Sequence, residues 1–138
     1  MFHYGHVNVF KNLKYHLSKE SQELGALSKV IVAVNSDDFA SSYKRVPIMN
    51  QYERLAVVNS CRYVDYAFIM DKYNNQPFFI EENSPDYIVM GTDWQSKDYF
   101  KQLCIDQQFL DRIDAEMLFV PYTDDISTTQ IIQRIKKL

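Results

Sequence analysis

Residues 29–35 read Lys-Val-Ile-Val-Ala-Val-Asn, an unbroken apolar run, mostly of β-branched side chains, between two polar residues. A continuous run of this kind is typical of a strand that is buried on both faces of a parallel sheet, because a half-exposed strand would alternate apolar and polar side chains. Further strands are predicted at Val64–Met70, Tyr87–Met90 and Met117–Val120. These four segments predict the strands of one buried sheet.

Helical patterns separate the predicted strands. Val7–Leu24 places apolar side chains mostly three or four residues apart, as one face of a helix does, and Gly25 is placed to end this helix. Apolar spacing or capping residues predict further helices at Asn50–Arg62, Gln76–Asn83, Lys97–Leu110 and Ser127–Leu138. Strand and helix alternate without a linker or repeat, which predicts a single α/β domain over residues 1–138 with a doubly wound, mostly parallel sheet.

Composition limits the classes of function. The 138 residues carry 15 Lys and Arg against 18 Asp and Glu, a formal net charge of −3. We therefore expect no nucleic-acid partner, and an anionic ligand needs a local site. No apolar run reaches the length of a membrane span and the N-terminus lacks the features of a signal peptide, which predicts a cytoplasmic protein. Cys61 and Cys104 have no partner at motif spacing, so we interpret them as structural thiols.

Residues 3–6 read His-Tyr-Gly-His and stand at the start of the first predicted helix. A helix N-terminus has free backbone N–H groups and a dipole that attracts anions, imidazole N–H groups can donate to phosphate, and Gly5 would let a bulky anion approach the backbone. These residues are a candidate phosphate site, with two merely solvated histidines as the alternative. Since only His16 and distant cysteines remain as further ligands, we expect no protein metal site.

Two other segments carry candidate ligand groups. Residues 127–130, Ser-Thr-Thr-Gln, form a second helix start with donors for an anion, although most such sequences only cap a helix. Residues 90–94, Met-Gly-Thr-Asp-Trp, end a strand at the sheet edge where folds of this class bind ligands, or else form a turn closed by an aromatic ring. Four cations are ordinary surface residues when taken singly: Lys44, Arg45, Arg54 and Arg62.

Five segments appear in the order of a known family: His3–His6, Lys44–Arg54, Arg62–Asp65, Met90–Trp94 and Ile126–Thr129. Over essentially its whole length the chain resembles the cytidylyltransferases, and among them the bacterial glycerol-3-phosphate cytidylyltransferases. The H-x-G-H motif alone is shared by the wider nucleotidyltransferase superfamily. The resemblance implies a Rossmann-like fold and transfer of CMP from CTP to a small phosphorylated alcohol, glycerol 3-phosphate first, with release of pyrophosphate.

The resemblance also implies roles for single residues. His3 and His6 would stabilise the triphosphate at the α-phosphorus, with Lys44 beside them, and Arg54 would contribute to the phosphate or acceptor pocket. Mg²⁺ would arrive with CTP, and the protein would be a homodimer with residues 62–65 as a candidate contact. Nucleotide contacts are implied for a further set: Gly5, Gly91, Asp93, Trp94, Ile126, Ser127 and Thr128.

The chain departs from the family pattern in three places. The family has a first strand ending in Gly-Thr-Phe-Asp before H-x-G-H, whereas Met1 and Phe2 stand here, so we predict that the first strand is absent and that the numbering begins at an internal methionine of a longer natural protein. Residues 122–125, Tyr-Thr-Asp-Asp, replace Arg-Thr-Glu-Gly, which removes a phosphate-binding arginine and a flexible glycine. The stretch Tyr15–Ser28 is longer than the usual link between helix and strand.

Two alternative functions stay open. An adenylyltransferase of the same superfamily would use ATP, although Trp94 and residues 126–129 favour CTP. A degenerate, non-catalytic nucleotide-binding relative is also compatible with the missing first strand and the lost arginine. A ligand that binds only the folded chain must raise its melting temperature, so CTP would stabilise either a cytidylyltransferase or a cytidine-nucleotide-binding relative.

Overall fold

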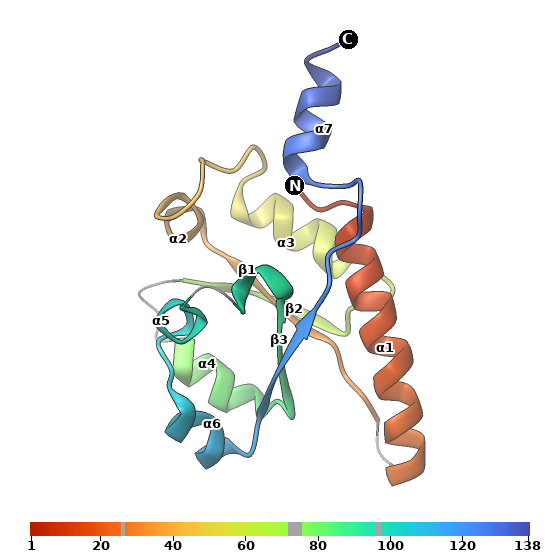
Figure 1. Ribbon diagram of the computed structural model, residues 1–138, viewed down its shortest axis with the longest axis vertical. Helices are drawn as coiled ribbons and strands as arrows, with labels where there is room; N and C mark the ends of the chain where they lie inside the picture. Colours follow the sequence, from red (N-terminus) through yellow and green to blue (C-terminus); the bar gives the residue numbers. More distant parts are fainter. Residues whose placement is uncertain (26, 72–75, 96–97) are drawn as a thin grey trace. The chain divides into compact units, whose positions relative to one another are not determined.

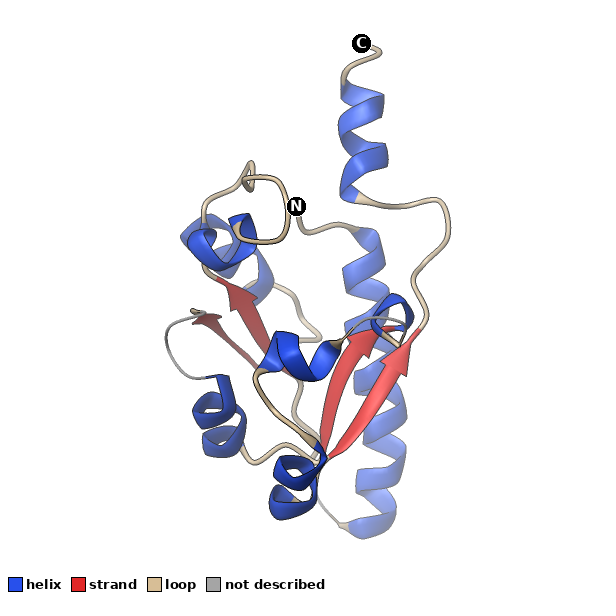
Figure 2. Cartoon of the chain, turned by 60° about the vertical axis from the view of Figure 1, so that its left-hand side comes forward, coloured by secondary structure: helices blue, strands red, loops and turns tan. Residues whose placement is uncertain are grey.

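The computed structural model describes residues 1–25, 27–71, 76–95 and 98–138. The chain forms two compact units, which are described one at a time. Unit 1 comprises Met1–Ile69 and Thr123–Leu138, and unit 2 comprises Met70–Tyr122. Figure 1 follows the chain through its elements, and Figure 2 shows how helices alternate with short strands. No helix within the described ranges is long and apolar enough to cross a membrane.

Unit 1 holds the first two strands and the longest helix. Strands β1 and β2 are neighbours in a two-stranded sheet. The core of this unit is formed by Val34 of β1, Val58 of α3 and Ala67 of β2. The elements are α1 (Tyr4–Leu24), β1 (Ile31–Asn35), α2 (Asp37–Ser41), α3 (Gln51–Asn59), β2 (Tyr66–Met70, whose last residue falls in unit 2) and α7 (Thr128–Ile135).

Local sequence signals set the ends of the helices in unit 1. Gly25 adopts the left-handed conformation that ends α1, with φ of 68°. Asn50 and Glu53 form the predicted capping box of α3, since the Asn50 side chain accepts from the Glu53 N–H at 3.0 Å and the Glu53 carboxylate accepts from the Asn50 N–H at 2.8 Å. The short helix α2 was not predicted, and the hydroxyl of Ser36 caps it.

Unit 2 is built around a parallel pair of strands. Strands β3 and β4 run in register from Tyr87 opposite Glu116 to Gly91 opposite Val120. Buried side chains from the helices and their connections cover the pair, among them Leu103 and Leu110. The elements are α4 (Gln76–Asn83), β3 (Tyr87–Gly91), the 3₁₀ turn η1 (Thr92–Trp94), α5 (Tyr99–Leu103), α6 (Gln107–Ile113) and β4 (Glu116–Val120).

The structure confirms the α/β class with parallel strands and corrects one helix. Residues 97–110 were predicted as a single helix, whereas α5 ends at Leu103 and is followed by Cys104, whose φ of 55° is left-handed. Helix α6 begins after Asp106, whose carboxylate accepts from the Phe109 N–H at 2.8 Å. The predicted start at Lys97 lies outside the described residues. Cys104 and Cys61 are free thiols. Residues 1–3 form no strand.

One ion pair joins α1 to the sheet of unit 1. The Lys14 ammonium donates to both carboxylate oxygens of Asp65, at 2.8 and 2.6 Å, and to the Ser28 carbonyl at 3.0 Å. Asp65 also accepts from the Val30 N–H at 2.7 Å. Burial opposes ionisation of Asp65, but the hydrogen bonds from Lys14 and Val30 and the charges of Lys14 and Lys29 outweigh it and hold the pKa of Asp65 below its ordinary value.

We predict that Lys14→Met lowers the free energy of unfolding by about 1 kcal/mol at pH 7, because both partners are partly exposed. Asp65 has a lowered pKa in the folded state, so its contribution is present above the unfolded value of 3.8 and is lost as the pH falls through the folded value. Urea titrations at pH 7 and pH 3 measure the loss of unfolding free energy at each pH. The matched control is Lys11→Met, since Lys11 is an exposed lysine on the same helix. An equal loss at both pH values would contradict the prediction.

Candidate active site

The two predicted histidines lie side by side at the start of α1. His3 is the residue that precedes the helix, and its backbone N–H donates to Nδ1 of His6 at 3.2 Å. The ring centroids of His3 and His6 are 4.1 Å apart, and the ring of Phe2 stacks on that of His6 with the centroids 5.5 Å apart. Because Nδ1 of His6 accepts this hydrogen bond, neutral His6 carries its proton on Nε2. His6 can therefore donate a hydrogen bond through Nε2.

Both histidines are held in the neutral state near pH 7. Burial is the main cause that lowers the pKa of His6 to about 4, and the charges of His3, the N-terminus and Lys44 add to it. Burial, followed by the N-terminal charge, also lowers the pKa of His3. Part of the His6 side chain remains exposed, so one side of the pair stays open to solvent. The pair therefore presents neutral hydrogen-bond donors.

Gly5 allows close contacts on its side of the helix. A Cβ at this position would lie 3.2 Å from Cε1 and Nδ1 of His3 and 3.2 Å from Cγ2 of Ile126. The space that was predicted to admit a phosphate is thus occupied by these two side chains. Nδ1 of His3 is buried and has no hydrogen-bond partner within the described ranges. A buried polar atom of this kind costs free energy until it is paired.

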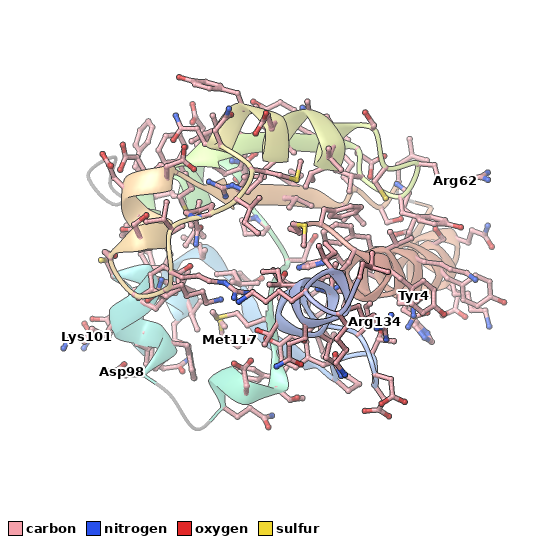
Figure 3. The ribbon with its side chains drawn as sticks, turned by 90° about the horizontal axis from the view of Figure 1, so that it is seen from above. Tyr4, Arg62, Asp98, Lys101, Met117 and Arg134 are labelled. Carbon is pink, nitrogen blue, oxygen red and sulfur yellow. The ribbon has the colours of Figure 1, made fainter. Side chains whose placement is uncertain are left out.

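The start of α7 meets the start of α1 within unit 1. The Thr128 hydroxyl donates to the Met1 carbonyl at 3.3 Å, and the Asn8 amide donates to the Thr123 hydroxyl at 3.2 Å. Ser127 caps α7 as predicted, because its hydroxyl accepts from the Gln130 N–H at 3.1 Å. The two helix starts lie next to each other in Figure 1 and in the view from above in Figure 3. Two sets of free backbone N–H groups therefore gather in one place.

Cations from the segment between α2 and α3 reach this place. Lys44 lies over the ring of Tyr43 at 5.3 Å, and its charge contributes to the lowered pKa of His6. Arg45 donates to the hydroxyl of Thr129, in the first turn of α7, at 3.4 Å. The sequence alone did not single out Arg45, because neighbouring loop cations look alike until a fold places one of them against a helix start.

Arg54 has a structural set of partners. Its guanidinium donates to the Asn35 carbonyl at 2.7 Å, to the Met49 carbonyl at 3.1 Å and to the Asp37 carboxylate at 2.6 Å. These contacts tie the end of β1 to α3 and to the segment before it. Burial is the main cause that lowers the pKa of the N-terminal ammonium, and the charge of Arg54 adds to it. A direct contact of Arg54 with phosphate stays a prediction.

The remaining predicted residues belong to unit 2. Gly91 ends β3, and Asp93 lies in the following turn, where its carboxylate accepts from the Tyr122 hydroxyl at 2.6 Å. The backbone of Trp94 completes the same turn, but its side chain lies outside the described residues. In the sequence, Tyr122 stands out only as the residue that replaces the family's arginine. Its role as a neighbour of Gly91 and Asp93 depends on the pairing of β3 with β4.

Asp125 stands where the resembled family has glycine, and the structure gives a reason for that glycine. Asp125 has φ of 58°, in the left-handed region that glycine occupies without steric cost. Its carbonyl accepts a hydrogen bond from Arg134 at 3.2 Å, which helps to fix the turn before α7. In this chain an aspartate adopts a left-handed backbone at this position.

Comparison with known proteins decides the family. The sequence model described as "Cytidylyltransferase-like" matches residues 1–134, which includes both helix starts and the end of β3. The chain belongs to the cytidylyltransferase-like family. This confirms the family inferred from the five sequence segments.

Two curated relatives illustrate the family's acceptor range. The chain is 26% identical over 139 residues to the glycerol-3-phosphate cytidylyltransferase of Bacillus subtilis, covering 100% of this chain and 92% of the relative. It is 30% identical over 141 residues to choline-phosphate cytidylyltransferase A of Mus musculus, covering 98% of this chain but 34% of the relative. The cytidylyltransferase relatives thus carry different acceptor names.

A solved structure confirms the fold of the cytidylyltransferase-like chain. The lipopolysaccharide core biosynthesis protein from Thermoplasma volcanium matches with a TM-score of 0.59 and 24% identity, covering 89% of this chain and 88% of that one. At this level of identity the likeness shows the fold alone. It agrees with the α/β order of elements that the sequence predicts.

We predict that His6 titrates well below the ordinary histidine value of 6.5, towards about pH 4, in a two-dimensional NMR titration of the imidazole signals. Because the unfolded chain binds this proton more readily, the neutral ring stabilises the fold above pH 6.5, and the contribution is lost as the pH falls towards 4. His6→Gln identifies the signal. A titration midpoint near pH 6.5 would contradict the burial and nearby positive charge that the structure gives to the His6 ring.

We predict that Asp125→Gly raises the free energy of unfolding by up to about 1 kcal/mol, since glycine removes the steric cost of a left-handed φ at this position. Asp124→Gly is the matched control, because φ of Asp124 is not positive and glycine there only adds freedom to the unfolded chain. Urea denaturation of the two variants provides the test. The idea fails if the two substitutions shift stability by the same amount in the same direction.

Proposed function

We propose that this chain transfers CMP from CTP to a small phosphorylated alcohol, with glycerol 3-phosphate as the first candidate, and releases pyrophosphate. The observation that carries the proposal is the meeting of two helix starts with two neutral histidines in unit 1. Helix N-termini and imidazole N–H groups bind anionic oxygens, and membership of the cytidylyltransferase-like family supplies the class of reaction.

In the proposed reaction an oxygen of the acceptor phosphate attacks the α-phosphorus of CTP. The bond from the α-phosphorus to the bridging oxygen breaks, and its electron pair leaves with pyrophosphate. A phosphate monoester has its second pKa near 6, so it is already an anionic nucleophile at pH 7 and needs no general base. Neutral histidines therefore suit this reaction, because their task is to donate hydrogen bonds rather than to accept a proton.

The chain's own groups would stabilise charge on the phosphoryl oxygens as the bond changes. His6 donates through Nε2, since its Nδ1 is committed to the backbone of His3. Lys44 adds a positive charge that already acts on this imidazole. His3 brings a second neutral imidazole beside His6, with the two ring centroids 4.1 Å apart. Phosphoryl transfer depends mainly on such positioning and charge neutralisation.

Mg²⁺ is proposed to enter as part of the substrate, bound to the phosphates of CTP. In the described part of the chain no group of three or more His, Cys, Asp or Glu side chains could hold a metal ion. The backbone N–H groups and cations at the two helix starts suit phosphate oxygens. When bound with CTP, the ion would neutralise phosphate charge. The hydrogen bonds to the phosphoryl oxygens would come from this chain's own residues.

We also propose which acceptor the chain uses and which residues lie near each part of the nucleotide. Glycerol 3-phosphate is favoured by the relative that the chain covers almost completely, and choline phosphate is the comparison acceptor. Gly91, Asp93 and Trp94 are proposed to lie near cytosine and ribose, and Ser127 and Thr128 near the phosphates. A homodimer that uses residues 62–65 and a cytoplasmic location also remain proposals. Arg62, labelled in Figure 3, extends away from the ribbon.

We predict that the chain releases pyrophosphate with CTP, Mg²⁺ and glycerol 3-phosphate, and that His3→Ala or His6→Ala lowers kcat by about 10²-fold or more, as loss of one donor to a developing oxyanion does. A coupled pyrophosphate assay measures the rates, with ATP in place of CTP and choline phosphate in place of glycerol 3-phosphate as parallel arms. The matched control is His16→Ala, a histidine on the same helix that contacts Tyr15.

The outcomes separate the alternatives. Release with ATP instead of CTP would indicate an adenylyltransferase. Binding of CTP without release, with every acceptor tested, would indicate the degenerate nucleotide-binding relative. A rate unchanged by both histidine substitutions would contradict the role given to the helix start. His16→Ala should keep the wild-type rate.

A further inference from the structure

The carboxyl ends of β3 and β4 bring three residues of unit 2 together. Gly91 is paired with Val120 at the last position of the parallel ladder, so the segments that follow the two strands leave from the same edge. Asp93 follows Gly91 in the η1 turn, and Tyr122 follows Val120 two residues later. Parallel α/β sheets bind ligands at this edge.

Tyr122 occupies the space that the missing side chain of Gly91 leaves. A Cβ on Gly91 would lie 2.4 Å from the Tyr122 hydroxyl oxygen and 2.5 Å from Cζ of its ring, so the phenol could not stay in place beside any larger residue. The backbone of Gly91 has an ordinary φ of −70°, and its glycine is therefore explained by this close approach and not by backbone conformation.

In this position beside Gly91, the Tyr122 hydroxyl donates a hydrogen bond to Oδ1 of Asp93 at 2.6 Å. Such a short bond to a carboxylate is among the stronger hydrogen bonds in proteins. Burial, the hydrogen bond and the charge of Asp93 together raise the pKa of Tyr122 to about 12, so the phenol remains a donor throughout the physiological range. The bond therefore fixes the orientation of the Asp93 carboxylate at the strand edge.

We propose that Tyr122 is a positioning residue for nucleotide recognition, because its hydroxyl, seated over Gly91, holds the Asp93 carboxylate ready to accept an N–H or O–H donor of the nucleoside. This inference rests on the proposed function. The donor is either the exocyclic amine of cytosine or a ribose hydroxyl, since both can donate to a carboxylate. A phenol carries no positive charge, so Tyr122 cannot reproduce the phosphate contact of the arginine it replaces.

The test measures the Kd of CTP by calorimetry for the wild type, Tyr122→Phe, Asp93→Asn and the double variant. We expect each single substitution to weaken binding about tenfold and the double variant to bind no more weakly than Asp93→Asn, because Tyr122 acts through Asp93. A purely structural role for Tyr122 would instead make the two losses multiply. The melting temperature of each variant shows that it is folded.

Gly91→Ala breaks the same bond by another route. The added Cβ displaces the Tyr122 hydroxyl, so the Kd of CTP should rise as it does for Tyr122→Phe. The matched control is Tyr87→Phe, which removes a hydroxyl at the opposite end of β3 and should leave the Kd unchanged. Agreement between Gly91→Ala and Tyr122→Phe supports a role for this hydrogen bond.

UTP and 2′-deoxyCTP identify the nucleoside group. If the cytosine amine is the donor, Tyr122→Phe weakens binding of CTP and 2′-deoxyCTP but not of UTP. If the ribose 2′-hydroxyl is the donor, 2′-deoxyCTP is the insensitive ligand. A general loss of stability would weaken the binding of all three nucleotides, so it cannot explain a loss that depends on one group of the nucleoside.

Failure of the role given to Tyr122 can be distinguished from failure of the proposed function. Unchanged CTP binding in Tyr122→Phe, or multiplied losses in the double variant, would overturn the inference and leave the proposed function standing. Binding of CTP that depends on Tyr122 through Asp93, but without release of pyrophosphate, would support the inference and overturn the proposed catalysis. Absence of CTP binding by the wild-type chain would overturn both.

Discussion

The candidate active site depends on one steric constraint, the lack of a side chain at Gly5. A Cβ here would stand 3.2 Å from the His3 ring and from the Ile126 methyl group, so a larger residue would force these side chains back. Through this approach the start of α7 reaches the start of α1, and the Thr128 bond to Met1 closes the contact. Imidazole rings, backbone N–H groups and loop cations then share one place, although they come from distant parts of the chain.

The electrostatics of this place follow from the same crowding. Burial and, after it, nearby positive charge both disfavour the protonated imidazoles of His6 and His3. The positive charge of Lys44 and its neighbours would also raise the affinity of this place for a triphosphate. The histidines are therefore neutral donors, with the fixed charge supplied by longer side chains. Cations on long side chains keep their hydration until an anion arrives, which a buried imidazolium could not do.

Most of the fold could be predicted from local patterns, because each strand is a compact apolar run and several helix ends carry a cap such as Gly25 or Asn50. The break between α5 and α6 could not, since Cys104 gives no sign of its left-handed φ. At the site, the motif with His3 and His6 identified the helix start, whereas the partners of Arg54 and the contact of Tyr122 with Gly91 depend on strand ends that pattern reasoning does not place.

Unit 1 is discontinuous, since it combines residues 1–69 with residues 123–138, and this has a consequence for how the chain matures. The contact between Thr128 and Met1 spans 127 positions, so its closure carries the entropy cost of a long loop and depends on residues that are synthesised after unit 2. A nascent chain can form β1 and β2 while it still lacks the α7 half of the candidate site. The two helix starts can therefore meet only after residues 123–138 have been synthesised.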